Sequence, residues 1–190
     1  MDIRSNEQLI EFLAQGNSAK FVFFWGHQAP KTGTSKSCFS QWFESSFEEN
    51  RVTFKTAEHY MMYYKAMTFE NEDIAKKILN SEHPAEAKKL GREVIGFDEE
   101  RWNKERFAIV VQANLLKFSQ NPALTEFLCS TGKRILVEAS PVDTVWGVGM
   151  AADDEAILSP QNWKGLNLLG YALMEVRSQL SEQKKLGERT

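Results

Sequence analysis

The sequence predicts one compact domain that is mainly α-helical, an orthogonal helical bundle with a few short β-strands. Its 190 residues suit a single domain with a sizeable core. Segments with helical periodicity recur along the chain, and several begin with a residue that typically caps a helix. No internal repeat, low-complexity segment or convincing linker divides the chain. We therefore expect one domain over residues 1–180, followed by a polar C-terminal tail over residues 181–190 that frays.

The first quarter of the chain is expected to hold a helix, two strands and a long loop. Residues 6–15 have an amphipathic pattern that ends near Gly16. The aromatic and β-branched run over 20–25 indicates a buried strand. Residues 26–47 contain Pro, Gly, Ser and Thr, which indicates a loop, and 52–54 suits a short strand. Long loops in compact domains are often functional.

Three helices are expected in the next stretch. Residues 54–69 have a helical pattern with Thr56 as the N-cap candidate, and no Gly or Pro interrupts the dozen positions after it. Residues 71–79 form a second helical segment. A third begins at His83-Pro84, with proline at the first helical position, and ends near Gly91.

The longest helix is expected over 97–118. Asp98 is its N-cap candidate, and Phe97 is placed to pack onto Trp102 as a hydrophobic staple. Beyond Arg106 the segment is apolar on most of its circumference, which is typical of a helix at the centre of a domain.

The last third of the chain adds two helices and one strand. Residues 121–130 suit a helix that opens on Asn-Pro, and 135–137 suit a short strand. A glycine-containing loop follows over 143–149. The final helix is expected over 168–180.

Composition narrows the functional classes. The net charge of -3 and a pI near 5.7 argue against an extended nucleic-acid-binding surface. Cys38 and Cys129 lack metal-ligand spacing, which favours a reducing, cytoplasmic setting. The N-terminal residues lack the apolar core of a signal peptide, and no apolar run approaches membrane-spanning length.

The 54–69 helix carries the strongest chemical candidates, Glu58 and Lys65. They are seven residues apart, close to two turns, so both project from one face, with Met61 and Met62 between them. Glu58 is either an ordinary first-turn carboxylate or a functional one. In both cases the helix macrodipole should lower its pKa and keep it ionised, which suits a base, a water-orienting group or a stabiliser of positive charge.

Lys65 is either a solvated surface lysine or a site residue. Its apolar neighbours on the same helix favour partial desolvation, which lowers the pKa of a lysine. A lysine of that kind can attack a carbonyl carbon or an opened sugar aldehyde to form an imine.

Each of the other candidate residues has a structural interpretation as well as a functional one. His59 has no partner at metal-ligand spacing, so we expect packing or hydrogen bonding and no metal site. Trp102 is either the staple or a ring that stacks on a base. Arg92 is either a helix-end cation or a phosphate clamp. Asp143 suits a turn, and the Gly147-Val-Gly149 stretch lacks the third glycine of a dinucleotide fingerprint.

Taken together, several segments resemble a known family. They occur in order from about Phe21 to Leu180 and are Thr56-Ala57-Glu58-His59-Tyr60-Met61-Met62 with Lys65-Ala66, Gly91-Arg92, Trp102, Lys117-Phe118, Leu136-Val137-Glu138, Asp143 to Trp146-Gly147-Val148-Gly149, and Trp163-Lys164-Gly165-Leu166-Asn167-Leu168-Leu169-Gly170 with Met174 and Arg177. This pattern resembles the NADAR family, which includes the riboflavin-biosynthesis-intermediate N-glycosidases.

The resemblance implies a mainly helical fold and hydrolysis of N-glycosidic bonds without a cofactor. Two kinds of substrate are associated with the family. One is the phosphoribosylamino pyrimidine intermediates of riboflavin synthesis, and the other is ADP-ribose attached to guanine in nucleic acid. A non-catalytic module that binds ADP-ribose or a nucleotide is a further alternative. No membrane association is implied.

The resemblance also assigns roles to particular residues. It implies that Glu58, Lys65 and Asp143 are catalytic. The residues expected to bind substrate are Trp102, Arg92, His59, Trp146 and Gly147. The family's usual Leu-Ser-Asn-Phe/Tyr segment appears here as Phe39-Ser40-Gln41-Trp42, so the family asparagine is replaced by a glutamine that is longer by one methylene.

Overall fold

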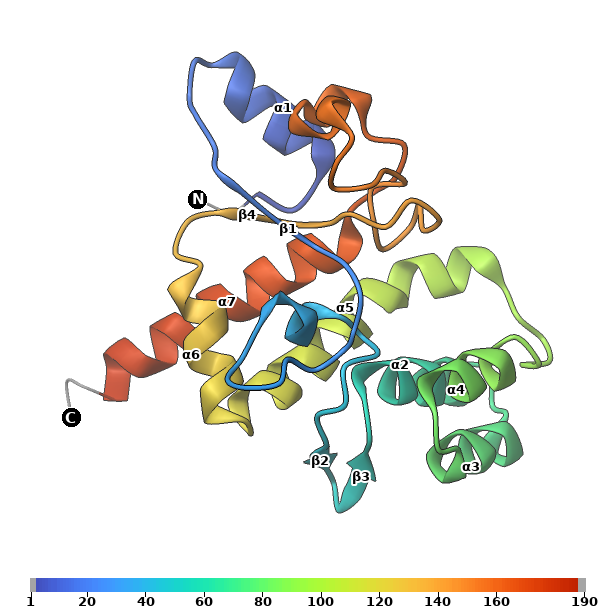
Figure 1. The fold of residues 1–190 in the computed structure, drawn as a ribbon. Helices are drawn as coiled ribbons and strands as arrows, with labels where there is room; N and C mark the ends of the chain where they lie inside the picture. The colour runs from blue at the N-terminus through green and yellow to red at the C-terminus, as the bar shows by residue number, and fades with distance from the viewer. Residues whose placement is uncertain (1–2, 188–190) are drawn as a thin grey trace.

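The computed structural model describes residues 3–187, in which helices predominate over a few short strands (Figure 1). The α-helices are α1 (Asn6–Ala14), α2 (Ala57–Thr68), α3 (Glu72–Asn80), α4 (Pro84–Gly91), α5 (Glu99–Ser119), α6 (Pro122–Ser130) and α7 (Leu168–Gly187). The strands are β1 (Phe21–Phe24), β2 (Phe47–Glu49), β3 (Val52–Phe54) and β4 (Ile135–Glu138), and three 3-10 helices are η1 (Lys36–Phe39), η2 (Glu155–Leu158) and η3 (Pro160–Asn162). The mainly helical, single-domain fold expected from the sequence is confirmed.

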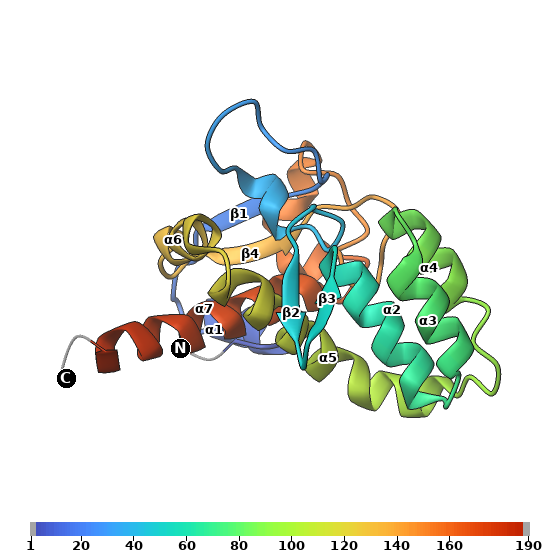
Figure 2. The same ribbon diagram turned by 90° about the horizontal axis from the view of Figure 1, so that it is seen from below.

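The elements fall into two groups joined by α5. Helices α2, α3 and α4 pack together on one side, whereas α6, α7 and the β1–β4 pair lie on the other (Figure 2). Helix α5 contacts α2 from the first group and both α6 and α7 from the second. It therefore occupies the central position that its apolar sequence predicted. Among the described residues no helix is long and apolar enough to cross a membrane.

Capping residues were predicted well. The Thr56 side chain accepts a hydrogen bond from the His59 N–H at the start of α2. Asp98 caps α5 in the same way, accepting from the N–H of Arg101. Pro84 occupies the first turn of α4, where its missing N–H costs nothing.

Three local expectations were wrong. Strand β1 is mostly half-buried: only Phe24 is buried and the adjacent Trp25 is 62% exposed, because the sheet has two strands and leaves part of β1 uncovered. Strand β2 lies at the end of a segment expected to be loop. Helix α7 continues to Gly187 instead of ending at Leu180, since the next residues are mostly good helix formers. Residues 188–190 of the expected tail lie outside the described residues.

The two strands β1 and β4 pair in parallel, with Phe24 opposite Glu138. Their carboxyl ends therefore open on the same side of the domain. Ligand sites in parallel sheets commonly form at this edge, where the chain leaves the strands. Here the chain leaves β4 into the 139–149 loop, which approaches the start of α2.

Candidate active site

The first turn of α2 forms one wall of the site. The main-chain N–H of Glu58 donates to the Gln41 carbonyl oxygen at 3.0 Å. This contact joins α2 to the loop that follows η1. Because the Glu58 N–H is bonded to this loop, the Glu58 side chain starts beside the loop and not in solvent.

Glu58 is buried, with 3% of its surface exposed, and its Oε1 atom has no hydrogen-bond partner in the protein. Burial raises the pKa of Glu58 to about 7, although Lys88 and a hydrogen bond from the Trp42 side chain oppose this. The expected ionised carboxylate is therefore wrong. Desolvation disfavours the charged form and outweighs the helix macrodipole, so Glu58 carries a proton much of the time near neutral pH.

Glu138 is a second carboxyl group in the site, which residue-by-residue reasoning did not select. It is the last residue of β4, and its Oε2 atom is buried without a protein partner. Burial raises the pKa of Glu138 to about 8, and the charges of Asp143 and Glu58 add to this increase. The sequence signal was an acidic residue directly after three apolar strand residues, at the end of a strand where sites often form.

Asn167 fixes the end of β4 and so the origin of the Glu138 side chain. Its Oδ1 accepts from the Glu138 main-chain N–H at 3.0 Å, and its Nδ2 donates to the Leu136 carbonyl at 2.9 Å. Asn167 is fully buried and adopts a φ of 54°, a conformation that asparagine tolerates better than most residues. The Asn167 side-chain amide therefore holds the main chain at the end of β4 by two hydrogen bonds.

Asp143 lies in the turn after β4 and completes a group of three carboxyl groups. Its Oδ1 accepts from the N–H groups of Val145 at 2.9 Å and Trp146 at 2.8 Å, which makes it the predicted turn-former. Its negative charge raises the pKa of both Glu58 and Glu138. The structure thus brings Asp143 close to Glu58, as the predicted catalytic set required.

Gly147 allows this turn to fold closely onto the end of β4. Its expected role in substrate binding stays a prediction. A Cβ at Gly147 would lie 2.9 Å from the Glu138 carbonyl oxygen and 3.0 Å from that of Asp143. Only glycine allows the loop to fold this closely onto the end of β4. The neighbouring Trp146 is half-buried and packs against the main hydrophobic core. Its expected role as a substrate-stacking ring has no direct geometric support.

Lys65 lies on α2 within reach of the charge of Glu58. Its Nζ donates to the Gly91 carbonyl at 2.8 Å and lies 4.4 Å from the centre of the Phe97 ring and 5.9 Å from that of Trp102. Burial lowers the pKa of Lys65, as expected from its apolar neighbours, and the charge of Arg92 lowers it further, while Glu58 raises it. Trp102, 8% exposed, is thus part of the surroundings of the amine.

Cations from α4 border the carboxyl groups. Lys88 lowers the pKa of both Glu58 and Glu138, and its Nζ lies 5.8 Å from the centre of the Trp42 ring. Exposed Arg92, the C-cap of α4, lies near enough to affect Glu58 and Lys65. Nothing in the local sequence distinguished Lys88 from the other lysines of this helix.

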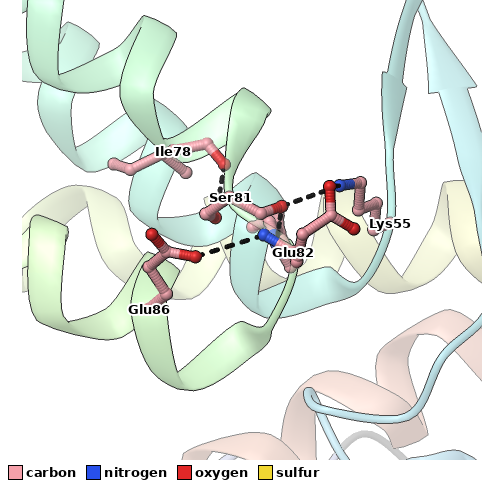
Figure 3. A network of polar contacts seen from close by, with 6 residues as sticks. Lys55, Ile78, Ser81, Glu82 and Glu86 are labelled. Carbon is pink, nitrogen blue, oxygen red and sulfur yellow. Dashed lines mark hydrogen bonds and ion pairs between the residues drawn. The ribbon is translucent and has the colours of Figure 1, made fainter.

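His59 makes the hydrogen bonds expected of it, whereas its expected role in substrate binding stays a prediction. Its Nδ1 lies 2.8 Å from the Thr56 hydroxyl, and its Nε2 lies 3.3 Å from the Ser81 carbonyl oxygen. The ring is fully buried, and burial lowers its pKa, so it is neutral. Ser81 belongs to a polar network with Lys55 and Glu82 that joins the start of α2 to the end of α3 (Figure 3).

These side chains create an acid–base site. Burial, together with the charge of Asp143, leaves Glu58 and Glu138 poised to hold protons at neutral pH. Carboxyl groups whose pKa values are driven apart by their surroundings can divide acid and base roles between them. Within the described residues, no three His, Cys, Asp or Glu side chains are grouped so that they would hold a metal ion.

The chain is similar to known proteins in sequence and in fold. The family model described as NADAR domain matches residues 23–181. N-glycosidase R617 of Acanthamoeba polyphaga mimivirus is 41% identical over 165 residues, a match that covers 84% of this chain and 96% of the viral protein. The chloroplastic riboflavin biosynthesis protein PYRR of Zea mays is 36% identical over 135 residues, covering 67% of this chain and 20% of the maize protein.

A solved structure shares the fold. The NMR structure of the E. coli protein YbiA aligns with a TM-score of 0.69 at 27% sequence identity. The alignment covers 88% of this chain and 89% of the bacterial one. The arrangement of helices around the β1–β4 pair is therefore a feature that this chain has in common with YbiA.

Proposed function

This chain belongs to the NADAR family and is an N-glycosyl hydrolase, and we propose that it hydrolyses the ribosyl C–N bond of phosphoribosylamino pyrimidine intermediates of riboflavin biosynthesis. The observation that carries the chemistry is the group of Glu58, Glu138 and Asp143 beside Lys65. The substrate is supported by the similarity to the maize protein named for riboflavin biosynthesis, a match over 20% of that protein. The acidic net charge of -3 also favours a small metabolite over duplex nucleic acid.

Glu58 is proposed to act first as a general acid. Cleavage of a glycosylamine requires a proton on the departing nitrogen or on the ring oxygen, and a carboxyl group with a pKa of about 7 can deliver it. Once ionised, the same carboxylate stabilises positive charge at the anomeric carbon or orients the attacking water. The charge of Asp143 raises the pKa of Glu58, so Glu58 keeps its proton until substrate cleavage begins.

Lys65 is proposed to be the nucleophile. Opening of the sugar ring gives an imine between C1′ and the base amine. The lone pair of the neutral Lys65 Nζ adds to C1′, and the two Nζ protons pass to the base nitrogen. The C1′–N bond to the base breaks, so that the base departs as a free amine and lysine is left as the imine. Water then adds to C1′ of the lysine imine and releases ribose 5-phosphate and the unmodified lysine. Burial favours the neutral amine that this addition needs.

The remaining assignments follow from position. Trp102, beside Lys65, is proposed to contact the base. Arg92 is exposed and cationic and lies near both Glu58 and Lys65, which suits a contact to the 5′-phosphate. No role in binding is proposed for His59.

A side-by-side assay tests the function. Purified protein is offered a phosphoribosylamino pyrimidine and, separately, an ADP-ribosylated guanine, and release of each base is followed. We expect the pyrimidine substrate to be cleaved faster and Glu58→Gln to lower kcat by about 10²- to 10⁴-fold. Glu93→Gln, which removes an exposed carboxylate from the α4–α5 connection, is the matched control and should retain full activity.

The outcomes separate the alternatives. Faster cleavage of the guanine substrate would overturn the substrate assignment but keep the glycosidase chemistry. Cleavage of neither, together with tight binding of ADP-ribose, would indicate a binding module. Full activity of Glu58→Gln would show that Glu58 is only a buried helix-end acid.

A further inference from the structure

Lys117 is a buried lysine for which the proposed reaction has no use, and burial lowers the pKa of its amine to about 7. It lies in α5, is fully buried, and its Nζ donates to the carbonyl oxygens of Cys38 at 2.7 Å and Ser40 at 2.9 Å. Both acceptors are neutral main-chain groups of the loop around η1. A lysine ammonium held without a carboxylate partner is costly to bury. A methionine would be enough for core packing at this position. The presence of a lysine therefore calls for a further reason.

The surroundings of Lys117 are otherwise apolar. Its Nζ lies 5.6 Å from the centre of the Phe43 ring and 5.3 Å from that of Phe118. The titratable group that faces it is the Cys38 thiol, whose pKa is raised to about 11 by burial. The Lys117 amine therefore has one evident task, to hold the two carbonyl groups, and it carries the N–H donors for this whether or not it is protonated.

Asn114 hydrogen-bonds the same loop from the same face of α5. It is three residues before Lys117, so the two side chains are neighbours on the helix surface. Its Nδ2 donates to the Gln41 Oε1 atom at 2.8 Å. Helix α5 thus makes three hydrogen bonds to the 38–41 segment, two of them buried and the third partly buried.

The 38–41 segment and the residue after it contact Glu58, the proposed acid. The Gln41 carbonyl accepts the Glu58 N–H, and the next residue, Trp42, hydrogen-bonds the Glu58 side chain. The main-chain N–H of Trp42 in turn donates to Ser40 Oγ at 3.1 Å. A shift of the loop would therefore move both contacts that Glu58 receives from it.

We propose that Lys117 is a positioning residue that, through Cys38 and Ser40, holds the 38–41 loop so that the Trp42 side chain reaches the Glu58 carboxyl group. The proposal deepens the proposed function, because it rests on Glu58 acting as the acid. Lys117 itself contacts neither Glu58 nor the other carboxyl groups of the site. Its effect passes through the loop.

The proposal separates two effects of Lys117→Met. This substitution keeps an unbranched side chain that is shorter by one atom, and it removes the donors. A purely structural lysine would change stability alone. A positioning lysine would also alter the Trp42 indole and the protonation of Glu58, because the indole hydrogen bond lowers the pKa of Glu58.

The first measurement does not depend on activity. The sequence has five tryptophans, so a ¹H–¹⁵N spectrum shows five indole N–H signals, and Trp42→Phe identifies the signal of Trp42. In Lys117→Met we expect the Trp42 signal to move upfield while the other signals stay in place. This readout remains valid even if neither proposed substrate is cleaved, so failure of the positioning role can be told from failure of the proposed function.

The second measurement is the pH profile of kcat/KM. In Lys117→Met the alkaline limb, where Glu58 loses its proton, should move up by about one pH unit. Combining Lys117→Met with Trp42→Phe should produce no further shift of the limb. The groups that also face Glu58 are unchanged in these variants and are Lys88 and Arg92 of the α4 segment, Lys65 of α2, Glu138 of β4 and Asp143 of the following turn.

Two further variants complete the design. Lys104→Met removes an exposed lysine from the same helix and should leave both readouts unchanged. If Lys117→Met does not fold, Lys117→Gln retains an amide donor and should show the same changes at smaller size. An unmoved Trp42 signal with an unmoved alkaline limb in a folded Lys117 variant would overturn the proposal.

Discussion

The charge of Asp143 raises the pKa of Glu138 across the turn that follows β4. The same charge acts on Glu58, which reaches the turn from helix α2. A single ionised carboxylate therefore favours the protonated form of two buried neighbours. This relationship connects the main chain of one loop to the acid chemistry of the whole site.

Asp143→Asn tests this relationship. Asparagine keeps the side-chain oxygen that accepts from Val145 and Trp146, so the turn should survive while the charge is lost. Without that charge the pKa values of Glu58 and Glu138 should fall, and the alkaline limb of kcat/KM should move down by about one pH unit. This direction is opposite to that expected for Lys117→Met. An unchanged limb in a folded Asp143→Asn protein would contradict the assignment.

The pH dependence of stability should report the buried acids. The pKa of Glu58 rises from 4.5 to about 7 on folding, so the folded state binds its proton more tightly than the unfolded state. Its contribution to the free energy of unfolding is therefore greatest below pH 4.5 and is lost as the pH rises toward 7, by on the order of 3 kcal/mol.

Urea unfolding at pH 5 and pH 8 measures this loss. Because buried His59 titrates with the opposite sign, the informative quantity is the difference between the unmodified protein and Glu58→Gln. The variant should lose less stability between the two pH values, whereas the exposed control Glu93→Gln should behave like the unmodified protein. Parallel losses in all three proteins would show that Glu58 titrates normally.

Borohydride tests whether Lys65 bonds to the sugar. Reduction during turnover should add a ribosyl-derived mass to the peptide that carries Lys65, because an imine at C1′ is reduced to a stable amine. Lys65→Arg should abolish the trapped adduct and lower kcat strongly. An active enzyme that never traps, and a Lys65→Arg variant with nearly full activity, would exclude the covalent route.

His59 is expected to affect stability and not binding. His59→Ala removes the ring that joins Thr56 to Ser81 and should lower the free energy of unfolding by about 1–3 kcal/mol. The KM of the remaining folded enzyme should stay nearly constant. Thermal unfolding and steady-state kinetics on the same sample measure both quantities. A large rise in KM with unchanged stability would restore His59 to the substrate site.

Local sequence features predicted the elements that carry the site. Thr56 marked the start of α2, and the helical period placed Glu58 and Lys65 on one face of it. Asp98 and Pro84 marked two further helix starts in the same way. The ordered motifs added the family and the pair of catalytic candidates. The helix signals are carried by residues close together in the chain, whereas the family pattern depends on motifs spread from about Phe21 to Leu180.

The tertiary structure alone decided how the site works. The protonation of Glu58 follows from burial and from charges on α4 and on the turn after β4, so a macrodipole argument confined to α2 gave the wrong direction. Glu138 lies at the site because β4 pairs with β1, and the ring nitrogens of His59 are occupied by Thr56 and by Ser81 at the end of α3. Sequence by itself determined which side chains α2 offers and on which face. Folding determined their protonation and partners, because desolvation and charge depend on residues that only the fold brings near.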